Sequence, residues 1–124
     1  MNREILFRGK PIGKGGIWVE GIGAYKTQTA EHIIVDAKEK SIVVVYLCQY
    51  TGLKDKNGKK IFEGDIIEGL KYKHFIKYDN VQASYVAINV DYPEDSGCHI
   101  TEKWIKECDK VVIGNVFDNK ELIK

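Results

Sequence analysis

The sequence has little proline, little cysteine and no long apolar run. It holds two prolines and three cysteines among 124 residues, and it has no low-complexity tract. Scarce proline together with 44% hydrophobic residues excludes a disordered chain. An odd number of cysteines without a regular spacing does not build a disulfide scaffold. These absences leave a globular protein with reduced thiols.

Membrane insertion and export are not expected. The longest apolar run, 42–48, is far shorter than the ~18 to 20 residues of a membrane-spanning helix. The N-terminal segment lacks the apolar stretch and the cleavage site of a signal peptide. We therefore expect a cytoplasmic protein that has no membrane contact.

Charge and length set two further limits. The 19 basic and 18 acidic side chains give a net charge of +1, which provides no global electrostatic attraction toward nucleic acid. With roughly 100 to 200 residues per domain as the usual size, residues 1–124 are expected to form a single domain.

The residue types favour strands, separated by Gly, Asn and Asp. Segment 41–50 is apolar at consecutive positions, which predicts a strand buried on both faces at the centre of the core. Thr101 is a predicted N-cap for a helix ending at Cys108, and 118–123 is a second short helical turn. Other strands are expected over 5–8, 16–21, 32–36, 60–62, 66–67, 70–78, 81–92 and 110–117. This pattern predicts an all-β fold, mainly an antiparallel small barrel or folded sheet, with one or two short helices.

A charged segment, 50–67, connects two of these strands. Its Asn57-Gly58 pair suits a tight hairpin turn with positive φ angles, and Glu63-Gly64-Asp65 turns the chain into the next strand. No nucleophile, metal cage or phosphate loop is assembled by its side chains. The segment therefore specifies backbone geometry.

Three segments carry a family resemblance. They are Arg3 to Lys10, Gln49 to Ile67, and Val112 to Ile123, in that order along nearly the whole chain. Together they resemble the YopX family of phage and prophage proteins. The resemblance implies a small β-rich protein with no established activity, and it supplies no catalytic residues. The Glu63-Gly64-Asp65 segment is also similar to a strand entry of SH3-like barrels, so an SH3-like element is possible.

Each candidate site for phosphate or metal binding has a simpler explanation. Segment 9–16 is glycine-rich, but no Ser or Thr follows its lysine as a phosphate loop requires. Segment 55–63 is too short for a calcium loop. Cys98, His99 and Cys108 carry zinc-ligand types without a Cys-x-x-Cys pair, and a fourth ligand would have to come from elsewhere in the chain. We expect no cofactor, no metal and no enzymatic activity.

The best binding signal is the basic segment 70–78. Its contact candidates for nucleic acid or another partner are Lys71, Lys73, Lys77 and Tyr78. Lysines interleaved with aromatic residues suit single-stranded nucleic acid. The favoured interpretation is nevertheless a solvated edge strand whose lysines prevent edge pairing. Tyr72 and His74 alternate onto the face opposite the lysines.

We therefore expect a small non-enzymatic binding protein that acts through an unknown protein partner or as a homo-oligomer. The alternative is a nucleic-acid-binding accessory factor in phage DNA transactions. This alternative would use the basic segment 70–78.

Overall fold

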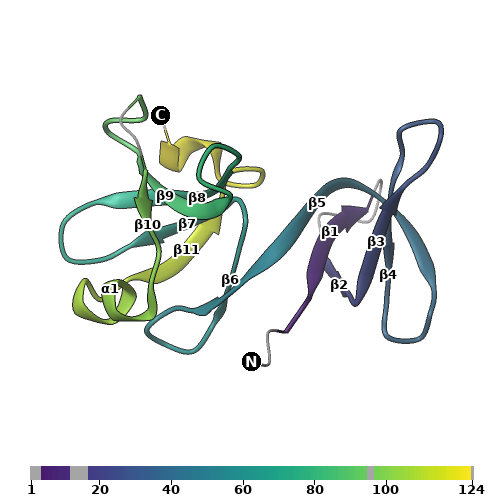
Figure 1. Cartoon of the computed structure of the whole chain (residues 1–124), viewed down its shortest axis with the longest axis horizontal. Coiled ribbons are helices and arrows are strands. Elements are labelled where there is room, and N and C mark those ends of the chain that lie inside the picture. Colours follow the sequence, from purple (N-terminus) through teal and green to yellow (C-terminus); the bar gives the residue numbers. More distant parts are fainter. Residues whose placement is uncertain (1–3, 12–16, 95–96, 124) are drawn as a thin grey trace. The chain divides into compact units, whose positions relative to one another are not determined.

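The computed structural model describes residues 4–11, 17–94 and 97–123 (Figure 1). The chain groups into two compact units, Met1–Tyr50 and Thr51–Lys124. Each unit contains an antiparallel β-sheet, so the all-β prediction is confirmed. No helix in the described ranges is both long and apolar enough to cross a membrane. That residues 1–124 form a single domain stays a prediction.

The first unit contains five antiparallel strands of a six-stranded sheet, whose sixth strand is β6 (Lys60–Phe62). Its strands are β1 (Phe7–Pro11), β2 (Val19–Gly21), β3 (Gly23–Lys26), β4 (His32–Val35) and β5 (Ser41–Lys54), which continues past the unit. Their order is β2-β1-β5-β4-β3, so β5 is the central strand of this order. The sequence prediction missed β3. The glycine-rich turn expected over 9–16 lies mostly outside the described residues.

Glycines allow this sheet to fold over its own core. A Cβ on Gly9 would approach Val44 to 2.6 Å, and one on Gly21 would approach Ile34 to 2.5 Å. Gly21 lies on β2 and Ile34 on β4, which are not neighbours in the sheet. The sheet therefore curls until these strands meet around a core that includes Ile34 and Val44.

The prediction that β5 is buried on both faces is wrong. Val44 is 3% exposed, but Val43 and Val45 are 38% and 48% exposed. Lys10 pairs with Tyr46 and Pro11 with Val44, so Val45 is an extra residue in a β-bulge. A bulge bends its strand and re-aims the side chains beside it. Periodicity alone could not show this local departure from regular pairing.

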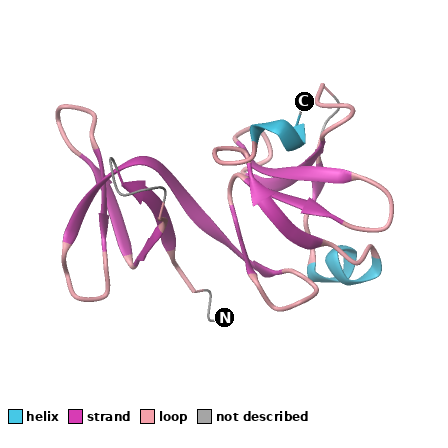
Figure 2. Cartoon of the chain, turned by 180° about the vertical axis from the view of Figure 1, so that it is seen from behind, coloured by secondary structure: helices cyan, strands magenta, loops and turns pink. Residues whose placement is uncertain are grey.

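The second unit is built on a five-stranded antiparallel sheet, in the order β10-β9-β8-β7-β11. The sheet strands are β7 (Asp65–Glu68), β8 (Lys73–Asp79), β9 (Ser84–Asn89), β10 (Cys98–His99) and β11 (Val111–Asn115). The unit also contains β6 (Lys60–Phe62), which lies outside this sheet and pairs with β5. Helix α1 (Glu102–Glu107) and the 3-10 turn η1 (Lys120–Ile123) complete the unit (Figure 2).

Packing in the second unit centres on α1. Ile105 of α1 forms a core cluster with Ile61 of β6, Ile67 of β7, Ile76 of β8 and Ala87 of β9. The predicted helix is confirmed with its cap, because Thr101 Oγ1 accepts the backbone N–H of Trp104 at 3.1 Å. A six-residue helix is marginal alone, so burial of Ile105 stabilises it.

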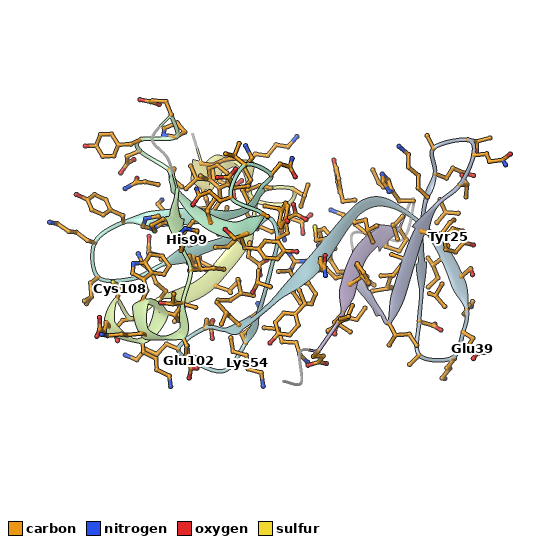
Figure 3. The ribbon with its side chains drawn as sticks, viewed as in Figure 1. Tyr25, Glu39, Lys54, His99, Glu102 and Cys108 are labelled. Carbon is orange, nitrogen blue, oxygen red and sulfur yellow. The ribbon has the colours of Figure 1, made fainter. Side chains whose placement is uncertain are left out.

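Three hairpin turns share one geometry. They begin at Thr27, Asp36 and Asp55, and in each the first N–H donates to the carbonyl four residues later. The fourth residue has positive φ in all three turns: Ala30, Glu39 and Gly58. The predicted hairpin at Asn57-Gly58 is confirmed, with the positive φ at Gly58 (+87°). Figure 3 labels Glu39 in the turn between β4 and β5.

Candidate binding surfaces

The basic segment 70–78 forms a central strand. β8 has hydrogen-bonded neighbours on both sides, β7 and β9, so the edge-strand interpretation is wrong. The alternation predicted for the strand is confirmed, since His74 and Ile76 are buried and Lys77 is exposed. Lys71 precedes the strand. Its ammonium lies 5.7 Å from the ring centroid of Tyr72.

The charges on β8 are partly balanced by acidic neighbours. Lys73 pairs directly with Glu68 of β7, and opposite charges at such positions attract. Near the other end of β8, the side-chain hydrogen bond from Gln82 chiefly lowers the pKa of Asp79, and the charge of Lys77 adds to this effect. The strand therefore presents a weaker positive field than its lysines suggest.

Tyr78 and the lysines of β8 lie on opposite faces of the sheet. It pairs with Tyr85 of β9, and the two rings pack edge to face with centroids 5.2 Å apart. Lys73 and Lys77 lie on the opposite face, because successive side chains of a strand alternate. A cleft of about 340 Å³ does include both Lys77 and Tyr78, with Val81, Val86, Ile88 and other residues in its lining. The contact role of Lys71, Lys73, Lys77 and Tyr78 stays a prediction.

The second unit contains a buried lysine that contacts polar and aromatic groups. Lys110 is 3% exposed, and its Nζ donates to the Tyr72 carbonyl at 2.7 Å. The same Nζ lies 3.4 Å from His74 Nδ1 and 5.4 Å from the ring centroid of Trp104. A Cβ on Gly69 would collide with the Cys108 carbonyl and the Lys110 stem. Glycine at position 69 therefore makes room for the lysine.

This burial shifts the pKa values of His74 and Lys110. Desolvation, and then the charge of Lys110, lowers the pKa of His74 to about 4. His74 is therefore neutral at neutral pH, and its Nδ1 can accept a hydrogen bond from the ammonium. Desolvation also lowers the pKa of Lys110. Nothing in the residue pattern indicated this cluster, because Lys110 stands at an ordinary strand entry.

A second buried charge holds the hairpin between β5 and β6. Asp55 is 7% exposed, and its Oδ1 accepts the N–H groups of Asn57 and Lys59, each at 2.9 Å. Its Oδ2 accepts the Val112 N–H of β11, also at 2.9 Å. Lys56 donates its own N–H to the Lys110 carbonyl at 3.0 Å. The hairpin turn is thereby fixed to the end of the sheet.

The first unit has an apolar groove, which we call the β1–β5 groove. It has a volume of about 470 Å³, and its lining consists of Pro11, Ile17, Val19, Lys40, Ser41, Ile42 and Val43. Ile17 is 70% exposed. Aliphatic side chains that remain open to water in a concave surface are typical of protein-binding sites.

The candidate zinc residues do not converge. Within the described ranges, no three His, Cys, Asp or Glu side chains gather closely enough to hold a metal ion. Cys98 Sγ lies 3.8 Å from the Ala87 carbonyl, and desolvation raises the pKa of its thiol. His99 Nδ1 lies instead 3.2 Å from Ser84 Oγ. A raised pKa disfavours the thiolate that zinc binding and nucleophilic attack require.

The fold defines a small all-β protein with two antiparallel sheets and a short capped helix. The family model described as YopX protein matches residues 12–124. The chain therefore belongs to the YopX family, as the three resembling segments indicated. Among curated proteins, none matches the sequence.

Proposed function

We propose that this chain is a non-enzymatic binding protein of phage or prophage origin, which acts in the host cytoplasm by contacting a protein through the β1–β5 groove. The groove itself carries the proposal, because it combines concave shape, an apolar lining and exposed aliphatic side chains. Removing such surface from water contributes about 25 cal/mol per Å². A partner that inserts an apolar side chain would gain this energy.

The chemistry of the groove limits the partner. Ile17, Val19 and Ile42 favour an aliphatic or aromatic anchor, and Lys40 adds a cation to the lining. A partner segment with an apolar side chain beside a carboxylate would match both features. A second copy of the chain is the first partner to examine, because a net charge of +1 opposes self-association only weakly.

Capture from induced lysogens would test this proposal. Tagged wild-type protein is compared with Ile17→Glu, which places a charge in the groove, and with Ile22→Glu, a similarly exposed site outside its lining. We expect a defined protein that is retained by the wild type and Ile22→Glu but lost with Ile17→Glu. Molar mass measured over a concentration series tests self-association with the same variants. Equal behaviour of all three proteins would contradict the groove as the contact surface.

The nucleic-acid alternative through Lys71, Lys73, Lys77 and Tyr78 has weaker support. The Glu68–Lys73 pairing reduces the positive field, and Tyr78 packs against Tyr85 instead of standing free for base stacking. Mobility shifts at low and raised salt test it, since phosphate contacts weaken steeply with salt. Absence of binding at low salt would remove this alternative.

A further inference from the structure

The turn between β5 and β6 concentrates positive charge at an exposed point. Residues 54–60 contain four lysines, which are Lys54, Lys56, Lys59 and Lys60. The only acidic residue among these seven, Asp55, is buried and accepts three backbone N–H groups. Its carboxylate therefore faces the protein, while the lysines surround the turn.

The lysines differ in their own partners. Lys56 Nζ forms an ion pair with Asp109 Oδ1 at 2.6 Å. Lys54 and Lys59 are exposed, and neither makes an ion pair within the described part of the chain. Like charges on one seven-residue turn repel one another, and bound anions would relieve that repulsion. Figure 3 labels Lys54 on the β5 side of the turn.

Hydrogen bonds to the neighbouring segment of the chain hold the turn in place. Gly58 adopts a φ of +87° without strain, and Asp55 and Lys56 are hydrogen-bonded to Val112 and Lys110. Ammonium groups carried on a fixed hairpin need less ordering on binding than those on a flexible loop. The cluster is thus preorganised for a regularly charged partner.

We propose that this hairpin, residues 54–60, binds the phosphate backbone of double-stranded nucleic acid without sequence preference. A two-stranded β-ribbon fits the major groove, which is ~12 Å wide. Lysine contacts phosphate as a point charge. Residues 54–60 contain no aromatic side chain to stack on bases and no aliphatic side chain to enter a bilayer. This surface is independent of the β1–β5 groove and goes beyond the proposed function.

Fluorescence anisotropy with a labelled 20-base-pair duplex tests the proposal on the full chain. We expect binding at low salt, with log K falling against log salt by about 0.9 per phosphate contact. Lys54→Gln/Lys59→Gln should flatten that slope by about 2 and weaken binding at least tenfold at low salt. The matched control, Lys26→Gln/Lys38→Gln, removes the same charge from exposed positions of the first unit and should retain the wild-type slope.

Three results would overturn the proposal. They are no duplex binding at low salt, an unchanged slope in Lys54→Gln/Lys59→Gln, and equal losses in both double variants. The last would mean that net charge alone governs binding. The first result includes a protein that binds anionic phosphatidylserine vesicles but not the duplex. All four substituted lysines are exposed. Circular dichroism checks that both double variants remain folded.

Discussion

Asp55 Oδ2 accepts a hydrogen bond from the Val112 backbone N–H at 2.9 Å, across 57 positions of sequence. The same carboxylate holds its own turn through Oδ1. One side chain thus closes a hairpin and joins it to β11. A carboxylate suits this position because both oxygens are acceptors.

Asp55→Asn should destabilise the protein by about 1 to 3 kcal/mol, the usual cost of an unsatisfied buried polar group. The amide oxygen could still accept the two turn N–H groups. Its NH₂ group would then face the Val112 N–H, placing a donor against a donor. Urea unfolding followed by circular dichroism measures the change in free energy.

Asp36→Asn is the matched control for this substitution. Asp36 accepts the N–H groups of Lys38 and Lys40 in the same type of turn, but the turn is exposed. We expect a change of less than about 0.5 kcal/mol. Equal losses in both variants would show that the Val112 bond adds nothing.

Stability should fall as the pH decreases through the range where free histidine titrates. The folded pKa of His74, about 4, lies below its ordinary value of 6.5, so protonation favours the unfolded chain. The stabilisation is complete above about pH 6.5 and decreases progressively toward about pH 4. Linkage gives a loss of about 2 kcal/mol between pH 7 and pH 5. Urea unfolding at several pH values measures this loss.

Substitution of single histidines separates His74 from other titrating groups. His74→Gln keeps an acceptor for Lys110 but does not titrate, so the loss between pH 7 and pH 5 should largely disappear. His99→Gln changes an exposed histidine and should leave the wild-type dependence. If His74→Gln retains the full dependence, the buried Lys110–His74 contact is not its source.

Gly64→Ala should destabilise the second unit more than Gly52→Ala. Both glycines have positive φ, +87° and +92°. A Cβ on Gly64 would lie 2.7 Å from the Phe117 ring, whereas one on Gly52 would meet nothing within 4 Å. We expect about 1 kcal/mol for Gly52→Ala, from backbone strain alone. The Gly64→Ala loss in thermal unfolding should exceed this, at about 2 to 4 kcal/mol; equal losses would contradict the steric argument.

Glycine should stabilise the two hairpins that lack it. Ala30 and Glu39 occupy the left-handed region, with φ of 67° and 63°. This strain costs about 1 to 2 kcal/mol per residue, offset in part by the greater chain entropy of glycine. Ala30→Gly/Glu39→Gly should therefore raise the melting temperature. Lys38→Gly changes a residue of the Glu39 turn that does not have positive φ, so it should lower the melting temperature.

Local features of the fold were predictable from the sequence. The Thr101 cap and the alternation in β8 follow from contacts within a few residues. β3 and β10 were missed because β3 contains glycine and alanine, and β10 has only two residues. The bulge at Val45 was also missed, since it depends on pairing with β1.

The candidate surfaces were less predictable, for a related reason. Nothing in the order of residues shows that Glu68 lies opposite Lys73, or that Asp55 reaches β11. The sequence shows the lysines of the hairpin turn. It does not show that the carboxylate of Asp55 is turned away from them into the protein. Contacts between distant segments decide which charges remain available to a partner.

The shared geometry of the three hairpin turns makes their loops equivalent attachment points. Residues Thr29, Lys38 and Asn57 each precede the positive-φ position, and all three are exposed. Cysteine-linked fluorophores at these sites would have closely similar local backbones. Differences between their spectra would then report on the surroundings of each loop, in a protein whose two tryptophans cannot distinguish these places.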